Sequence, residues 1–128
     1  MEYHIIPIAK PRMTRRDKWL SPPRNCVRKY WNFRDQCRDQ YHLKKVILPC
    51  SGAHVVFILP MPQSWSKKKK LEMDGSKHED KPDLDNLLKA LGDALYDNDS
   101  FIWDVRITKI WGYEGKIVIK ENRTKRKR

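Results

Sequence analysis

An apolar stripe at helical spacing dominates the middle of the chain. Leucines and alanines recur there every three or four residues, at Leu84, Leu87, Leu88, Leu91, Ala94 and Leu95. This period predicts an amphipathic helix that buries one face. The helix is expected to begin at Asp83 or Asp85, because Pro82 disfavours a helical Lys81 and an aspartate can cap the first turn. It should end near Tyr96.

The remaining apolar patterns predict one more helix and four strands. A helix is expected over 26–43, where an aromatic stripe belongs in the core. Strands are expected over 3–8 and 54–59, and the second is apolar throughout, which predicts a central strand buried on both faces. A strand-rich stretch over 102–111 and a strand over 116–120 are expected to form a hairpin through a glycine turn.

These elements follow the order β-α-β-α-β-β. That order indicates an α/β (α+β) sandwich, with a mixed four-stranded sheet and about two helices on one of its faces. At 128 residues the chain is expected to form a single domain.

Charge adds a function class to this outline. The chain has 28 Lys and Arg against 16 Asp and Glu, which gives a net charge of +12. An excess of this size is typical of nucleic-acid-binding proteins, and the five tryptophans fit the same class. The alternative is a basic protein that binds acidic protein or membrane surfaces.

One cationic segment is a loop over 10–19, directly after the first predicted strand. Arg12, Arg15 and Arg16 are expected to contact the DNA backbone there, because arginine makes forked hydrogen bonds to phosphate oxygens. The alternative is an ordinary solvated surface loop.

A second cationic segment is the low-complexity stretch 63–81, where a mobile loop is expected. The cations expected to bind DNA from it are Lys67, Lys68, Lys69, Lys70 and Lys81. Trp65 stands beside the lysine run, where it either stacks on an unpaired base or wedges a junction, or else packs on the flank of the domain. A basic tail over 122–128 is expected to be disordered and to add only non-specific affinity.

Several classes of protein are disfavoured by what the chain lacks. No apolar run approaches the roughly 20 residues of a transmembrane helix, and the first residues do not resemble a signal peptide, so a cytoplasmic protein without a membrane partner is expected. The three cysteines form no C-x-x-C pair, which favours free thiols and argues against zinc. There is no glycine-rich phosphate loop and no serine or cysteine nucleophile motif, so no small-molecule cofactor is expected.

Carboxylates nevertheless cluster around the predicted helix. Asp83 and Asp85 precede its first turn, Lys89 follows Asp85 by four residues, and Asp97 and Asp99 come after its end. One interpretation is a capped helix with a surface ladder of alternating charges. In so basic a chain, clustered carboxylates instead suit a divalent cation that is delivered to a phosphate, since Mg²⁺ prefers oxygen ligands.

The motif from Asp83 to Leu91, followed by Asp93-Ala94-Leu95 and Asn98-Asp99-Ser100, resembles the RusA-like endonucleases. These are Holliday-junction resolvases of bacteria, phages and prophages, and the segment 62–70 is similar to the phage-type branch. The resemblance covers the chain from about Val55 to its end.

The resemblance implies one RusA-like nuclease domain over 1–128. It implies that Asp83, Asp85 and Asp99 bind Mg²⁺, with Mn²⁺ as a substitute, and that these residues and Lys89 are catalytic. Lys89 would neutralise the phosphate or orient water.

The expected function is therefore a Mg²⁺-dependent, structure-specific DNA endonuclease that resolves four-way junctions by paired symmetric nicks. It would act in recombination and repair, in the cytoplasm, or in the host cytoplasm if it is phage-encoded. The alternatives are a non-catalytic DNA-binding protein on the same fold and a nuclease for other branched DNA.

Helix length raises a geometric question about Asp99. Twelve helical residues span about 18 Å, so Asp99 would lie at the opposite end from Asp83 and Asp85. Ligands of one Mg²⁺ cannot be that far apart. Either the chain folds back along the helix, or Asp99 completes the site of a second subunit in a homodimer. A homodimer is expected, because the junction is itself two-fold symmetric, and a further hypothesis is that each site takes residues from both chains.

Overall fold

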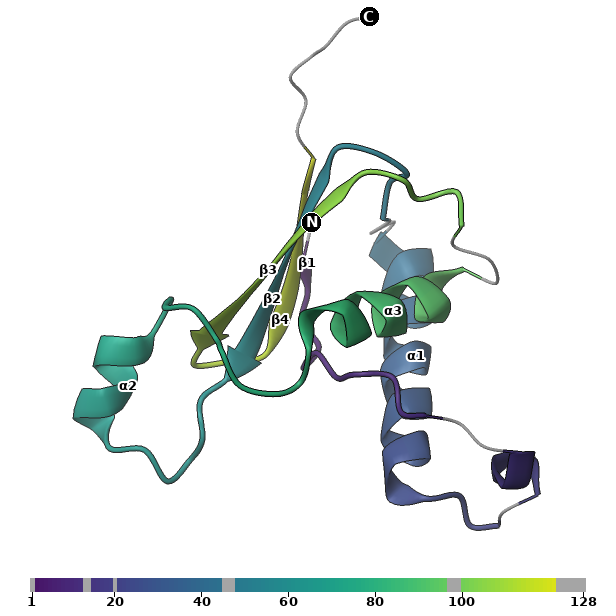
Figure 1. Ribbon diagram of the computed structural model, residues 1–128, viewed down its shortest axis with the longest axis horizontal. Coiled ribbons are helices and arrows are strands. Elements are labelled where there is room, and N and C mark those ends of the chain that lie inside the picture. The colour runs from purple at the N-terminus through teal and green to yellow at the C-terminus, as the bar shows by residue number, and fades with distance from the viewer. Residues whose placement is uncertain (1, 13–14, 20, 45–47, 97–99, 122–128) are drawn as a thin grey trace, which may run out of the picture.

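The computed structural model describes residues 2–12, 15–19, 21–44, 48–96 and 100–121, drawn in colour in Figure 1. The described residues form four strands, three α-helices and a short 3₁₀ turn. They are, in chain order, β1 (Glu2–Tyr3), η1 (Arg15–Lys18), α1 (Asn25–Lys44), β2 (Ala53–Pro60), α2 (Lys67–Met73), α3 (Leu84–Leu95), β3 (Val105–Gly112) and β4 (Lys116–Glu121).

The four strands form one mixed sheet in the order β1-β4-β2-β3. Strand β2 pairs with β3 in parallel and with β4 antiparallel, while β1 is antiparallel to β4. The central position of β2 and the mixed sheet confirm the predicted fold. One face of β2 is buried through Val55, Phe57 and Leu59, but His54 and Ile58 on the other face are only half-buried, so burial on both faces is incomplete.

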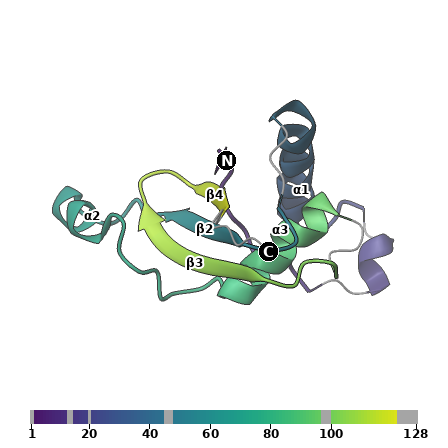
Figure 2. The ribbon, with the colours of Figure 1, turned by 90° about the horizontal axis from the view of Figure 1, so that it is seen from above.

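Helices α1 and α3 cover the same face of the sheet, as Figures 1 and 2 show from two directions. The core lies between them and the sheet, and it includes Tyr30, Phe33 and Cys37 from α1 and Leu87, Ala90, Leu91 and Ala94 from α3. Both predicted stripes are therefore core, as expected. Arg38 of α1 donates to the carbonyl of Ala94 at 2.9 Å, which satisfies one of the last carbonyls of α3.

The predicted hairpin of β3 and β4 is wrong, because β2 lies between them. The link from Gly112 to Gly115 crosses the end of β2. A Cβ at Gly112 would lie 2.4 Å from the side chain of Ile58, and one at Gly115 would lie 2.7 Å from the Cα of Ile6. The glycines permit this close crossing. The most apolar strand takes the centre of the sheet because it gains most from being covered on both edges.

The segment 63–81 is not the irregular loop that its composition predicts. It contains α2, which begins at the N-cap Ser66, whose hydroxyl accepts from the backbone N–H of Lys69 at 3.1 Å. After α2 the chain pairs with β3: Gly75 donates to the Trp111 carbonyl at 2.9 Å, and Trp111 donates to the Ser76 carbonyl at 3.0 Å. Helix α2 projects beyond the end of the sheet, apart from α1 and α3 (Figures 1 and 2). The mobility of this segment stays a prediction.

The first strand is shorter than the predicted 3–8, because only Glu2 and Tyr3 pair with β4. Pro7 has no N–H with which to continue a ladder, although Ile5 still reaches the core. The tail 122–128 lies outside the described residues.

Two further sequence expectations can be compared with the structure. All three cysteines are free thiols, as predicted. Burial raises the pKa of Cys37 to about 12, so this thiol stays protonated and inert. Within the described part of the chain, no helix is long and apolar enough to cross a membrane.

Candidate active site

Asp83 and Asp85 stand at the beginning of α3, where the sequence places them. Asp83 is the N-cap residue, with an extended backbone at φ −70° and ψ 148°, but its carboxylate makes no capping hydrogen bond. Asp85 lies in the first helical turn, and both residues are exposed. Neither carboxylate has a hydrogen bond or ion pair within the described residues. Among the described contacts, both carboxylates are therefore open to solvent.

Lys109 of β3 fixes the chain that leads into these acids. Its ammonium donates to the carbonyl of Asp80 at 2.6 Å and to that of Pro82 at 2.8 Å. Asp83 follows Pro82 directly, so Lys109 determines where the first acid stands. Sequence reasoning missed this residue, although a lysine between Ile107 and Ile110 in a strand was a signal that could have identified it.

A pocket with cationic walls lies beside the same helix. It has a volume of about 380 Å³ and is lined by Lys10, Pro11, Arg12, Asn86 and Lys89. Three of these residues come from the segment after β1 and two from α3. The fold thus brings the N-terminal loop next to the helix that carries the acids, a proximity that no local pattern predicts.

Asp93 joins the two lysines of this pocket. Its Oδ2 lies 2.7 Å from Lys10 Nζ and 3.8 Å from Lys89 Nζ. Lys10 also stands over the ring of Tyr30, 5.8 Å from its centroid. Burial and the Asp93 carboxylate raise the pKa of Tyr30 to about 12, so the ring stays neutral beneath the ammonium group. Lys10, which the sequence had not singled out as a site residue, is thus a fixed part of the pocket.

The charge ladder that the sequence offered as the plain alternative is only half present. Lys89 pairs with Asp93 one turn later, but Asp85 and Lys89 form no ion pair among the described contacts. In a full ladder the Asp85 carboxylate would pair with Lys89, and among the described contacts it does not.

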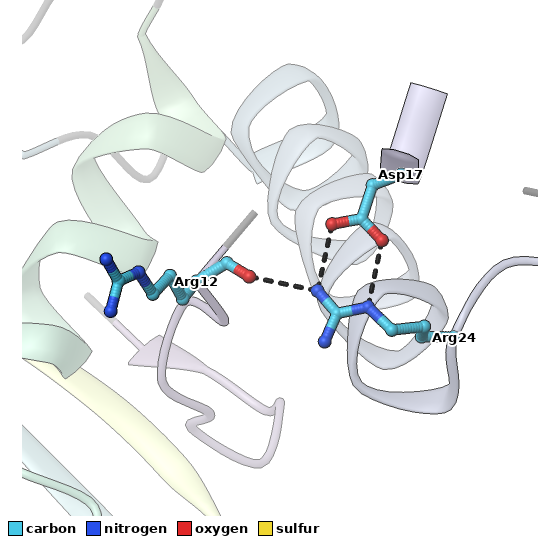
Figure 3. Close-up of polar contacts among 3 residues, drawn as sticks. All are labelled: Arg12, Asp17 and Arg24. Carbon is cyan, nitrogen blue, oxygen red and sulfur yellow. Dashed lines mark hydrogen bonds and ion pairs between the residues drawn. The ribbon is translucent and has the colours of Figure 1, made fainter. Parts of the chain in front are cut away.

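Arg12 is held at the pocket by a clasp that Figure 3 shows. Arg24, at the beginning of α1, donates from Nε and Nη2 to the two carboxylate oxygens of Asp17, both at 2.9 Å. The same Nη2 donates to the main-chain carbonyl of Arg12 at 2.9 Å. Asp17 is only 7% exposed, and its forked bond raises the pKa of the Arg24 guanidinium further. The Arg12 side chain itself is directed away from the clasp, towards α3.

The model of the family "Endodeoxyribonuclease RusA" matches residues 2–121, nearly the whole chain. The chain belongs to the RusA endodeoxyribonuclease family. A search of curated proteins and a search of solved structures each return no match. The resemblance carried by the motif around Asp83 and Asp85 is thereby confirmed and extends to the N-terminal segment, while the phage-type branch stays a prediction.

The third predicted ligand of this RusA-family chain, Asp99, lies outside the described residues. No group of three or more His, Cys, Asp or Glu side chains suited to a metal occurs in the described part of the chain. Ser100, the next residue, lines a pocket together with Leu88 and Gly92 of α3. Leu88 and Gly92 share one helical face with Asp85, so Ser100 lies beside the side of α3 that also carries this acid.

The residues predicted to bind DNA fall into two groups. Arg12 and Lys81 lie near the beginning of α3, and Arg16 is exposed on η1. Arg15 is also part of η1, but its side chain is not described. The other group is the lysine run of α2, in which Lys67, Lys68 and Lys69 are exposed and Lys70 is half-buried.

Trp65 belongs to a column of stacked side chains at the end of the sheet. Its ring lies 4.8 Å from that of Trp111, with Lys69 Nζ 4.2 Å from its centroid, and His78 stacks on Trp111 at 4.0 Å. In this arrangement Trp65 packs on the flank of the domain, which was one of the two open alternatives. Its use as a wedge or stacking residue stays a prediction.

Proposed function

We propose that this chain is a Mg²⁺-dependent endonuclease that resolves four-way DNA junctions by paired symmetric nicks, as a homodimer, in recombination and repair. Its place of action would be the cytoplasm, or the host cytoplasm for a phage-encoded protein. The observation that carries the proposal is the pair of carboxylates at Asp83 and Asp85, which have no partner among the described residues and lie beside a cationic pocket, in a chain of the RusA family.

The donor set fits a hard divalent cation. Asp83 and Asp85 present carboxylate oxygens, both exposed and unpaired within the described residues, and Asp99 would add a third. A bound Mg²⁺, or Mn²⁺ in its place, would supply charge neutralisation at the phosphate and activation of water. The residues of the chain would do the rest: Lys109 positions Asp83 through the main chain, and Lys89 brings a positive charge to the phosphate one turn from Asp85.

DNA binding would use both cationic groups of the chain. Arg12, Arg15, Arg16 and Lys81 would hold the backbone near the cleavage site. Lys67, Lys68, Lys69 and Lys70 of α2 would hold an arm further away, because α2 projects beyond the sheet (Figure 1). Phosphate contacts of this kind fix orientation and make affinity steeply dependent on salt.

A homodimer would supply the two nicks that a two-fold symmetric junction requires. As a further hypothesis, each site takes residues from both chains, with Asp99 of one chain completing the site that Asp83 and Asp85 of the other chain begin. Mixing an Asp83→Asn chain with an Asp99→Asn chain tests this point. Restored cleavage would show that sites are shared between subunits, and cleavage at background would support the single-subunit site.

The first experiment is cleavage of a labelled four-way junction in Mg²⁺ by wild type and by Asp83→Asn. Paired nicks in opposite strands, lost in Asp83→Asn with binding retained, would support the proposal. Tight junction binding without cleavage by the wild type, in Mg²⁺ or Mn²⁺, would favour a non-catalytic DNA-binding protein. Equal cleavage of flaps and other branched DNA would favour a nuclease of broader specificity.

A further inference from the structure

We propose that Lys10, Arg12 and Lys89 form a binding site for one DNA backbone phosphate, at or directly beside the cleaved one, and that Asp93 positions its two lysines. The nature of the ligand rests on the proposed function. The site itself rests on a pocket, two ion pairs and a hydrogen-bonded clasp.

The charge at this pocket suits an anion. Three cationic side chains, Lys10, Arg12 and Lys89, line the pocket, and together with the carboxylate that pairs with the two lysines they carry a net charge of +2. Asn86 adds an amide to the lining, so neutral hydrogen-bond donors are also present. A volume of about 380 Å³ admits a phosphodiester group with room for water.

Asp93 holds the two lysines unequally, and this inequality favours a binding role. The ion pair with Lys10 is short at 2.7 Å, and both of its side chains are about three-quarters buried. The pair with Lys89 is longer at 3.8 Å, and the Lys89 side chain is 63% exposed. Lys10 is thus the fixed wall of the pocket, whereas Lys89 can leave Asp93 for a phosphate at little cost.

Arg12 completes the site from the same N-terminal segment as Lys10. Its main chain is held by Arg24, which is itself fixed by the buried Asp17, so the position of Arg12 is set before any ligand arrives (Figure 3). Its exposed guanidinium has no hydrogen bond or ion pair among the described contacts and is directed towards α3. Because the main chain of Arg12 is already fixed, only its side chain has to lose freedom when a phosphate binds.

The distance from the acids identifies which phosphate would bind. Asp85 and Lys89 are four residues apart on one helix, so their Cα atoms are separated by about 6 Å along its axis. A phosphate held by Lys89 therefore lies within one helical turn of the carboxylate expected to hold the metal. That separation corresponds to the cleaved phosphate or its immediate neighbour on the strand.

The test compares Lys10→Gln with a matched control, Lys29→Gln, an exposed lysine of α1 that lies outside the pocket. Junction binding is measured without metal over a range of salt concentrations. Lys10→Gln is expected to weaken binding several-fold and to reduce the salt slope by about 1. The control Lys29→Gln should lose less than half as much junction affinity, and Lys10→Arg should recover most of the affinity that Lys10→Gln loses. Equal losses in the two glutamine variants would overturn the inference.

A second arm locates the bound phosphate with junctions that carry single neutral methylphosphonate linkages. At the linkage held by the pocket, Lys10→Gln should cause no further loss of affinity, since the charge that Lys10 contacts is already gone. At every other linkage the loss should persist. A loss that is the same at all linkages would show that Lys10 acts only through the general field, which overturns a discrete site.

Asp93→Asn separates positioning from general charge. Removal of the carboxylate should raise metal-free junction affinity about two- to fivefold, because a repulsive charge near the phosphate is lost. The rate of cleavage at saturating protein should nevertheless fall about tenfold, since the two lysines are no longer held in place. If affinity and cleavage rate change in the same direction, Asp93 has a structural role only and its positioning role is overturned.

These arms distinguish the inference from the proposed function. Absence of cleavage by the wild type in Mg²⁺ and Mn²⁺ would defeat the proposed function. The metal-free binding and methylphosphonate experiments would still show whether the pocket binds a backbone phosphate. Cleavage by the wild type together with unchanged binding and cleavage by Lys10→Gln would defeat the pocket alone.

Discussion

Two basic regions of this molecule differ in how their charges are organised. Around the beginning of α3, cations from three distant segments meet carboxylates and main-chain carbonyls at fixed positions, as in the contacts of Lys10, Arg24 and Lys109. On α2, a run of lysines lies along a short helix that is anchored by its aromatic neighbours and otherwise faces solvent. Lysine and arginine residues thus form a structured site in one region and a general electrostatic surface in the other.

The difference shows that local charge density is a poor guide to chemistry. The lysine run is the most conspicuous feature of the sequence. Yet Lys67, Lys68 and Lys69 are exposed, and among the described residues none of them forms an ion pair with an acid. Lys10 begins a basic loop and Lys109 is a single lysine within an apolar strand, yet each has a specific partner. Specific partners require elements that are brought together by the fold.

The largest expected effect distinguishes the two regions directly. Asp85→Asn should lower the rate of junction cleavage by about 10³-fold or more, since a proposed metal ligand is lost, with little change in junction affinity. Neutralising Lys67, Lys68, Lys69 and Lys70 to Gln should instead weaken binding by about tenfold at moderate salt and leave the cleavage rate at saturating protein nearly unchanged. Single-turnover cleavage and gel shifts on the same junction check both. Similar losses of cleavage rate would remove the distinction.

A smaller effect is expected for Lys109→Met, which releases the carbonyls of Asp80 and Pro82. The cleavage rate should fall by about 10- to 100-fold while junction affinity stays within about twofold, because Asp83 is displaced and no DNA contact is lost. Lys120→Met, an exposed lysine on β4, is the matched control. A parallel fall in affinity and rate would indicate that Lys109 contacts DNA instead.

The anchoring of α2 predicts an effect on stability rather than on chemistry. Trp65→Ala removes the contact with Trp111 and the partner of Lys69, and should expose the segment 63–78 to hydrogen exchange. The expected loss of stability is about 1–3 kcal/mol, with cleavage at saturating protein little changed. If exchange in this segment is unaffected, the stacked column does not anchor α2.

The smallest effect is a pH dependence from His78, which stacks on Trp111 in the same column. Burial, followed by the charge of Lys109, lowers the pKa of His78 below its ordinary value of 6.5. As pH falls, the unfolded chain therefore binds the proton before the folded chain does. The free energy of unfolding has its full value, as far as His78 is concerned, above about pH 6.5, and it decreases as pH falls through the lowered pKa of His78. Thermal unfolding of wild type and His78→Phe between pH 7.5 and 5 checks this.

His54 is the control for that measurement. Burial and the charges of Arg106 and Lys120 lower its pKa in the same direction. His54→Gln should therefore retain the part of the slope that His78 causes. A wild-type slope that survives His78→Phe in full would show that His78 does not contribute.

The sequence predicted the elements whose signals are local and strong. The leucine stripe of α3, the aromatic stripe of α1 and the apolar run of β2 each demand burial, and each is found in the predicted place. The hairpin failed because strand pairing depends on which strand gains most from the centre of the sheet, and a short link with two glycines does not reveal that. Helix α2 was missed because its polar composition carries no apolar period, and its stability comes from Ser66 and the Trp65 stack.

By itself, the sequence determined the RusA resemblance, the pair of acids at the beginning of a helix, and the basic character of the chain. These depend on residue types at short spacing, which a single helix or turn expresses on its own. Only the tertiary structure decided that Asp83 and Asp85 have no partner in the described part of the chain, that Lys10 and Arg12 line one pocket with Lys89, and that Lys109 fixes the approach to the acids. The physical reason is distance along the chain: Lys10 and Asp93 are 83 residues apart, and only a folded core places them 2.7 Å from one another.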